Sequence, residues 1–309
     1  HQFFPIDHIF FSKKFINFWK PNLAIFIESE IWPSMFKNLK KKNIPLILLN
    51  ARITSRSFNR WSKIKKFSES IFKLISIAYP QNNETKFFLK KLNVKSIKLI
   101  GNLKFIQNKK LIKNINKNEK KLFKQFKKYK TFVAASTHPT EEILAAKTHL
   151  LLKKKNKNFI TVIIPRHVER TNEIISELKK FKLKIVVHSS KNKNLNNKDI
   201  YIVDTFGESK KFYKIASTVF VGGSMINRGG QNPLEPARYG TKILHGPNVG
   251  NFKEIYDYLN SLNISTKVKT PLEISNSFKL KKNMSNVTKI DIIGKNILKK
   301  TLKELNKSI

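Results

Sequence analysis

The sequence predicts an α/β protein built from two doubly wound units, each around a parallel sheet. Short continuous apolar runs alternate with amphipathic segments of helical length, a pattern typical of βαβ units. Polar and charged residues follow directly after several of these runs, at the strand ends where open α/β sheets place their ligands. Residues 106–128 are rich in Lys and Asn, which predicts a linker leading into a helix between the two units.

Composition limits the class of protein. The chain has 309 residues, enough for two domains, and 40% of them are apolar. The formal net charge is +42, but only seven of the 62 basic residues are Arg and Lys is spread along the chain, which argues against a nucleic-acid-binding patch. Such a charge would favour an anionic membrane surface. The absence of Cys excludes disulfides and thiolate metal sites, and no apolar run reaches the ~18 to 20 residues of a spanning helix.

In the first half of the chain, we expect an amphipathic helix within residues 1–22 and a strand at 23–27, buried on both faces. Glu28 and Glu30 follow this strand and either face a ligand or cap the next helix. Later strands are expected at residues 44–49, 75–79 and 97–100, with helices at about 32–40 and 61–72 and another beginning after Pro80.

Two of these later strands end in candidate ligand-binding groups. Arg52 and Arg56, with three hydroxyl residues around them, could bind phosphate or face solvent. Lys104 follows a Gly-Asn turn at a strand end, a placement that separates it from the many surface lysines.

In the second half, Ser136 and His138 follow a strand, and Thr137 or Thr140 is expected to cap a helix whose first turn holds two glutamates. Arg166 stands at another strand end and offers a planar fork suited to phosphate, while His167 after it is a base, a proton donor or a structural histidine. Strands are predicted at residues 131–135, 159–164, 184–187, 200–203, 219–221 and 242–244.

Residues 219–240, VFVGGSMINRGGQNPLEPARYG, combine a strand, two glycine pairs and a helix start. Glycines such as Gly223, beside Ser224, let backbone approach a ligand, and the amides at a helix start attract anions. Asn232 and Glu235 are expected on one helical face, where the carboxylate accepts from a ribose hydroxyl. A Gly-rich turn with a capped helix is the alternative interpretation.

Two α/β units joined by a linker suggest a GT-B glycosyltransferase. The ordered motifs IESEIWP, LLNARITSRS, GNLKF, VAASTHPTEE, IIPRHVER, VDTFGE and VGGSMINRGGQNPLEPA resemble those of the 3-deoxy-D-manno-octulosonic acid (Kdo) transferases. This resemblance implies inverting transfer of Kdo from CMP-Kdo to a lipid A precursor in lipopolysaccharide assembly. It implies no metal and no cofactor, and it places the protein at the cytoplasmic face of the inner membrane, peripherally or through an N-terminal anchor upstream of His1.

The resemblance also assigns residues. It implies that Glu28 and Lys104 stabilise the transition state and that a second set binds CMP: Pro165, Arg166, Gly207, Glu208, Ser209, Asn232, Pro233, Leu234 and Glu235. Further candidates are Glu30, Arg52, Ser136, His138, Gly223 and Ser224.

The chain departs from the family pattern at a few positions. Ser209 replaces a Leu, Gln231 a His and Ile106 an Asp. The family's general base, a glutamate, is expected upstream of His1, so we expect little turnover from residues 1–309 alone.

The expected domains are residues 1–110, the remainder of an incomplete N-terminal acceptor-side domain; 111–128, the linker and a helix; 129–285, the CMP-sugar domain; and 286–309, a helix that packs back on the first domain. Other GT-B transferases, nucleotide-sugar epimerases and basic nucleic-acid-binding proteins remain alternatives.

Overall fold

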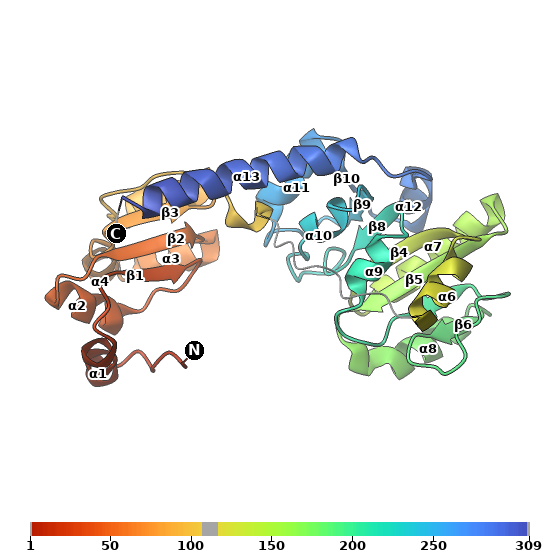
Figure 1. Ribbon diagram of the computed structural model, residues 1–309, viewed down its shortest axis with the longest axis horizontal. Helices are drawn as coiled ribbons and strands as arrows, with labels where there is room; N and C mark the ends of the chain where they lie inside the picture. Colours follow the sequence, from red (N-terminus) through yellow and green to blue (C-terminus); the bar gives the residue numbers. More distant parts are fainter. Residues whose placement is uncertain (1, 107–116, 308–309) are drawn as a thin grey trace. The chain divides into compact units, whose positions relative to one another are not determined.

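The computed structural model describes residues 2–106 and 117–307. The chain divides into two compact units, a first unit of residues 1–107 with 291–309 and a second unit of residues 108–290 (Figure 1). Both are α/β, as predicted, and every strand pair in both sheets is parallel. No helix in the described part of the chain is both long enough and apolar enough to cross a membrane.

The first unit contains a three-stranded sheet in the order β1-β2-β3. Its core packs Phe36, Leu48 and Phe72 between the sheet and the helices. Asn82 begins one helix as predicted, since its side chain accepts a hydrogen bond from the N–H of Thr85. The elements are α1 (Ile9–Trp19), β1 (Ala24–Ile27), α2 (Pro33–Lys41), β2 (Leu46–Ala51), α3 (Ser55–Lys63), α4 (Lys65–Phe72), β3 (Ile77–Pro80), α5 (Asn83–Lys91) and the 3₁₀ turn η1 (Leu103–Phe105).

Three expectations for the first unit are wrong. Strand β1 lies at the sheet edge and is only partly buried on one face, while Ile25 and Ile27 on the other face are 42% and 53% exposed. The strand expected at residues 97–100 is reduced to one bridge between Ala78 and Ile97. In place of the single helix expected at 61–72 there are two helices, α3 from Ser55 and α4 from Lys65, which are separated at Ile64.

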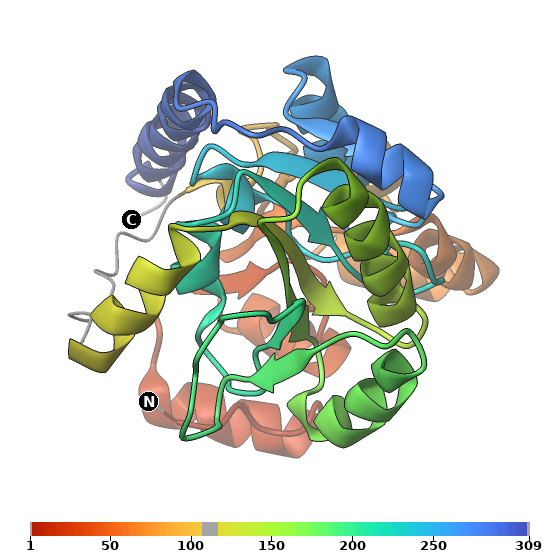
Figure 2. The same ribbon diagram turned by 90° about the vertical axis from the view of Figure 1, so that its right-hand side faces the viewer.

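The second unit contains a seven-stranded sheet in the order β10-β9-β8-β4-β5-β7-β6. Figure 2 shows α6 and α7 on opposite sides of these strands. Because all the strands are parallel, their carboxyl ends share one edge, where the candidate ligand-binding loops lie. The elements are α6 (Lys117–Phe126), β4 (Lys130–Thr137), α7 (Glu141–Lys155), β5 (Phe159–Pro165), η2 (Val168–Arg170), α8 (Thr171–Lys179), β6 (Ile185–Val187), β7 (Ile200–Ile202), α9 (Ser209–Tyr213), β8 (Thr218–Val221), α10 (Leu234–Ala237), β9 (Lys242–His245), α11 (Lys253–Ser261), β10 (Ser265–Lys267) and α12 (Pro271–Ser277). The last helix, α13 (Ser285–Leu305), begins in this unit, which ends at Ile290.

Two features of the second unit differ from expectation. The edge strand β10, of sequence Ser-Thr-Lys, was not predicted because it has no apolar run. Thr140 occupies the position before α7, but its backbone has a positive φ of 80° and its hydroxyl makes no capping hydrogen bond.

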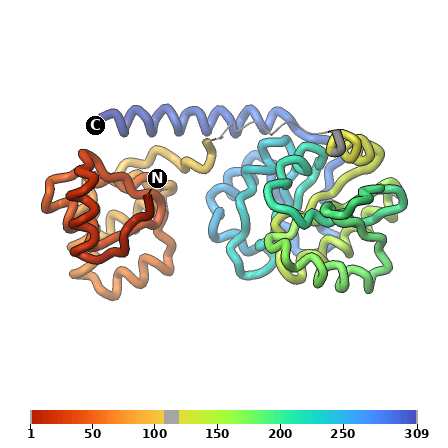
Figure 3. The backbone as a smooth tube through the Cα atoms, turned by 60° about the horizontal axis from the view of Figure 1, so that its bottom comes forward, coloured from red at the N-terminus to blue at the C-terminus, as the bar shows by residue number. Residues whose placement is uncertain are grey.

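The C-terminal helix α13 is one continuous helix of 21 residues (Figure 3). Its residues from Asp291 onward belong to the first unit. There, Lys98 forms an ion pair of 2.7 Å with Glu304. Much of the linker lies outside the described residues, which resume at α6.

Candidate functional site

The two predicted transition-state residues of the first unit are in contact. The Nζ atom of Lys104 lies 3.0 Å from Oε1 of Glu28. Glu28 follows β1 and Lys104 lies on η1, so the fold brings together two segments far apart in the sequence. Both side chains are partly exposed, at 36% for Glu28 and 24% for Lys104, which leaves the ion pair accessible to a ligand.

Backbone geometry fixes Glu28 at the end of β1. The residue has a positive φ of 59°, which turns the chain sharply after the strand. Its N–H donates to the carbonyl of Leu49 at 3.0 Å, and its carbonyl accepts from the N–H of Arg52 at 3.1 Å. These bonds tie the Glu28 turn to β2 and its following loop.

Two asparagines hold the turn that carries Lys104. Asn50, which is buried and also has a positive φ of 50°, accepts a hydrogen bond from the N–H of Leu103 at 3.0 Å. Asn102 accepts one from the N–H of Lys104 at 3.0 Å. Asn50 is not among the predicted site residues, although an Asn at the end of a buried strand is a recognisable signal for a left-handed turn.

Helix α13 packs closely against this turn. A Cβ atom added to Gly294 would lie 2.4 Å from the carbonyl oxygen of Phe105. One added to Gly101, whose φ is +109°, would lie 2.9 Å from the side chain of Ile297. The contact therefore requires glycine on both surfaces.

The other candidates of the first unit have structural contacts. Oε2 of Glu30 accepts from the indole N–H of Trp32 at 2.8 Å, and the hydroxyl of Ser29 donates to the carbonyl of Arg52 at 2.8 Å. The alternative that the glutamates cap α2 is wrong. The carboxylate of Asp7 does so instead, by accepting from the N–H groups of Ser34 and Met35 at 3.2 and 3.0 Å.

In the second unit, basic groups gather at the ends of β4 and β5. His138 is buried and its ring centroid lies 5.7 Å from that of His167. Burial lowers the pKa of His138, and the nearby charges of His167, Arg228, Arg166 and Arg170 lower it further. Positive groups that converge in this way favour an anionic ligand.

Arg166 is the most available of these cations. It directly follows β5 and is exposed, and it forms no ion pair with any described residue. Arg170, in contrast, pairs with Glu142 at 3.1 Å and with Glu173 at 3.0 Å. Pro165 is buried and places Arg166 at the sheet edge, where the N–H of Arg166 donates to the carbonyl of Thr137 at 2.9 Å.

Glu141 organises the glycine-rich loop after β8. This glutamate is fully buried at the start of α7 and accepts four backbone hydrogen bonds: from His138 at 3.0 Å, Gly223 at 2.7 Å, Ser224 at 3.0 Å and Met225 at 2.9 Å. Burial raises the pKa of its carboxyl, while the four amides lower it. Sequence reasoning placed this glutamate in the first helical turn but missed its contact with the loop.

The backbone of the same loop lies very close to the backbone at the end of β4. A Cβ atom on Gly222 would lie 2.4 Å from the carbonyl oxygen of Ser136, a residue that itself has a positive φ of 54°. Gly223 has a φ of +65° and lies beside the ring of His138. The hydroxyl of Ser224 is buried, donating to Val221 and accepting from Gly246, so it is not available to a ligand.

The remaining members of the predicted CMP set lie at the starts of α9 and α10. Lys210, directly after Ser209, has its Nζ 3.9 Å from Oε1 of Glu235, so the two segments are neighbours. Glu208 interacts with Lys211 at 2.8 Å and with His188 at 3.8 Å. Gly207 takes a positive φ of 83°.

One expectation for this segment is wrong. Helix α10 begins only at Leu234, after Pro233, and Asn232 lies outside it. Its Oδ1 accepts from the N–H of Leu234 at 3.0 Å, so Asn232 stabilises the helix start and does not share a helical face with Glu235. Across the described ranges there is no group of three or more acidic or histidine side chains placed to hold a metal ion.

Comparison with known proteins reveals relatives over nearly the whole chain. Residues 1–107 match the family described as 3-deoxy-D-manno-octulosonic-acid transferase (kdotransferase). The 3-deoxy-D-manno-octulosonic acid transferase of Rickettsia typhi is 36% identical over 302 residues, which cover 97% of this chain and 64% of that protein. The protein of the same name from Rickettsia felis is 34% identical over 318 residues, covering 99% of this chain and 68% of that protein.

The solved structures agree on the fold. The UDP-GlcNAc 2-epimerase of Methanocaldococcus jannaschii superposes with a TM-score of 0.56 at 12% identity, covering 92% of this chain and 80% of that chain. The fold is GT-B, as the sequence predicted. This chain spans about 64% of the length of the Rickettsia typhi protein. The identity and coverage of the Rickettsia felis protein establish that the chain belongs to the 3-deoxy-D-manno-octulosonic acid transferase family.

Proposed function

We propose that the protein is an inverting glycosyltransferase that transfers Kdo from CMP-Kdo to a lipid A precursor in lipopolysaccharide assembly. The observation that carries this proposal is the 3.0 Å ion pair between Glu28 and Lys104, in a chain related over its length to Kdo transferases. The sequence resemblance assigns both residues to transition-state stabilisation, and the fold places their side chains in contact.

In the proposed reaction, an oxygen of the acceptor sugar bonds to the anomeric carbon of Kdo as the bond from that carbon to the CMP phosphate breaks. The acceptor hydroxyl would lose its proton to a general base, which the family resemblance gives as a glutamate, and the departing CMP gains negative charge. The ammonium group of Lys104 is suited to stabilise negative charge, and Glu28 positions that group.

The second unit supplies the donor site in this proposal. Arg166 would bind the phosphate, supported by the positive field around His138. Glu235 would accept from a ribose hydroxyl, and the turn formed by Gly207, Glu208 and Ser209 would contact the base. The Lys210–Glu235 distance of 3.9 Å supports the last two assignments, because it joins the segments that carry them.

We also propose that α1 rests on an anionic membrane at the cytoplasmic face of the inner membrane. Phe10, Phe18 and Trp19 on this helix are 61%, 75% and 51% exposed, among the lysines of the same segment. Exposed aromatic side chains beside basic residues are typical of interfacial helices. Binding to vesicles with anionic lipids should weaken as salt rises, and binding that is indifferent to salt would contradict this assignment.

The donor proposal is tested by calorimetric titration of the chain with CMP, UMP and AMP at near-physiological salt. We expect selective binding of CMP that Glu235→Ala and Arg166→Ala each weaken by about tenfold or more. Lys147→Ala, at an exposed position on α7, serves as the control and should leave CMP affinity unchanged. Equal affinity for the three nucleotides, or unchanged CMP affinity in both site variants, would overturn the donor assignment.

A further inference from the structure

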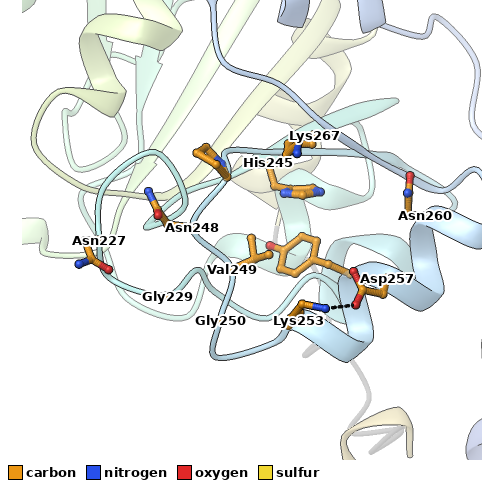
Figure 4. A pocket seen from close by; sticks show the side chains of 12 residues that line it. Asn227, Gly229, His245, Asn248, Val249, Gly250, Lys253, Asp257, Asn260 and Lys267 are labelled. Carbon is orange, nitrogen blue, oxygen red and sulfur yellow. Dashed lines mark hydrogen bonds and ion pairs between the residues drawn. The ribbon is translucent and has the colours of Figure 1, made fainter. Parts of the chain in front are cut away.

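A cavity lies in the second unit at the segment that follows β9. It has a volume of about 520 Å³ and is lined by the segment after β9, the start of α11 and the end of β10. Gly229 and Asn227 of the glycine-rich loop form another wall (Figure 4). None of its lining residues belongs to the predicted CMP set.

The walls of this cavity are held in place by hydrogen bonds. Asn248 donates from its backbone N–H to the carbonyl of Ser224 at 2.8 Å and from its side chain to that of Met225 at 3.2 Å. The hydroxyl of Tyr256 on α11 donates to the carbonyl of Gln231 at 3.0 Å. The cavity is therefore a built part of the fold and shares the loop that carries the CMP-binding candidates.

His245 contributes an unpartnered acceptor to the cavity. This residue is only 6% exposed, and its Nδ1 atom lies 2.7 Å from the carbonyl oxygen of Gly246. Because a carbonyl oxygen can only accept, Nδ1 carries the proton, so neutral His245 has an unprotonated Nε2. Burial lowers the pKa of His245 and favours this neutral form. Within the described ranges Nε2 has no hydrogen-bond partner.

The charges around the cavity are unevenly paired. Lys253 is paired with Asp257 at 2.8 Å, as the dashed line in Figure 4 shows. Lys267, drawn beside His245 in the same view, forms no ion pair with any described residue. The positive charge of Lys267 interacts with the imidazole and contributes to the lowered pKa of His245. The free ring nitrogen of a largely buried histidine thus lies beside one unpaired cation.

We propose that this cavity binds a hydroxyl-bearing sugar with an anionic substituent, with His245 Nε2 accepting from a hydroxyl group and Lys267 facing the carboxylate or phosphate. The inference rests on the proposed function, which supplies two such sugars: the acidic sugar of the donor and the phosphorylated sugar of the lipid acceptor.

Strand order supports this placement. The proposed nucleotide contacts follow β5, β7 and β8, and β9 lies next to β8 on the side away from β5 and β7. The segments after β8 and β9 are therefore neighbours at the edge of the sheet that carries the proposed nucleotide contacts. The cavity, lined by His245 at the end of β9 and Lys267 at the end of β10, lies at this same edge.

The test is a titration of the ¹⁵N-labelled chain, followed through the ring nitrogen resonances of its seven histidines. His245→Asn assigns the His245 signals and removes Nε2, while its side-chain amide can still donate to Gly246. His245→Gln places a polar atom near the position of Nε2 and tests for rescue. The probes are free Kdo, glucosamine 1-phosphate and uncharged glucose, with CMP titrated in parallel.

We expect an anionic sugar to shift the His245 Nε2 resonance. Lys267→Ala should weaken this response by about tenfold, whereas Lys269→Ala, an exposed lysine outside the cavity, should not change it. A response to Kdo alone would identify the donor sugar as the source, and a response to glucosamine 1-phosphate alone would identify the acceptor. His245→Asn should leave CMP affinity unchanged.

Two results would overturn the proposal: no His245 response to either anionic sugar, or an equal response to glucose. If CMP still binds in that case, the proposed function stands and only the cavity assignment fails. If the His245 signal responds to the sugar but the chain does not bind CMP, the cavity assignment stands and the proposed nucleotide site is overturned.

Discussion

The backbone N–H of Gly223 donates a hydrogen bond of 2.7 Å to the buried carboxylate of Glu141, 82 positions away in the sequence. This contact joins the start of α7, the helix that follows β4, to the glycine-rich loop after β8, and β4 and β8 are neighbours in the sheet. With its three further amide donors, Glu141 sets the shape of the loop that leads to the proposed CMP-binding residues.

Glu141→Gln should therefore destabilise the second unit and weaken CMP binding. Gln has an N–H₂ group, which cannot accept a hydrogen bond, where Glu141 has its second carboxylate oxygen. At least one buried hydrogen bond from the backbone to a charged group is therefore lost, which lowers the free energy of unfolding by about 3 kcal/mol. The free energy of unfolding from denaturant titration and the CMP affinity measure the two effects. Glu169→Gln, at an exposed glutamate, is the control. Wild-type values for the Glu141 variant would contradict the role of this carboxylate.

Lys104→Ala should lower turnover more than donor affinity in a catalytically active form of the protein. The ammonium group is proposed to stabilise charge that develops in the transition state, and loss of such a contact commonly costs a factor of ~10² to 10³ in rate. Steady-state kinetics with separate donor-binding measurements provide the comparison. If donor affinity falls while turnover is retained, Lys104 acts in ground-state binding.

Local sequence patterns predicted the elements whose formation depends on neighbouring residues. The apolar run at residues 131–135 became β4, and Asn82 caps α5 through its own side chain. The positions of Glu28 and Lys104 after apolar runs indicate that each is a candidate, and the resemblance implies the same role for both. Their contact was not predicted, because it depends on the fold of the whole first unit.

The expectations that failed depended on tertiary context. Ile25 and Ile27 form an apolar run, but at an edge strand the pleat turns both to one exposed face. The run from Ile97 to Ile100 forms only one bridge to β3, and Gly101 then turns away with a φ of +109°. The hydrogen bonds to Glu141 from the loop after β8 span more than 80 positions, so no local pattern could indicate them.

Gly294→Ala should destabilise the first unit, although the same change in an exposed helix interior stabilises a protein by roughly 1 kcal/mol. The new Cβ would lie 2.4 Å from the carbonyl oxygen of Phe105, which forces α13 away from the turn that holds Lys104. Overpacking of this kind costs about 1 to 3 kcal/mol. Asn296→Ala, at an exposed position of the same helix, is the matched control. Denaturant titration of both variants measures the difference, and equal stability would mean that the helix and the turn separate without cost.

Stability should fall as pH decreases from 6.5 toward 4 because of His149. This histidine is fully buried between Thr161 and Asp199, and burial lowers its pKa from 6.5 to about 4, although Asp199 opposes the shift and Lys153 adds to it. Below pH 6.5 His149 of the unfolded chain binds a proton more readily than His149 of the folded chain. The contribution of the neutral histidine to the free energy of unfolding is therefore fully present above pH 6.5 and is lost as the pH falls from 6.5 to the folded pKa. The loss amounts to about 3 kcal/mol. Denaturant titrations across this range should show the decrease in the wild type and in His167→Gln, an exposed control, but not in His149→Gln. A decrease of equal size in His149→Gln would assign the pH dependence to another group.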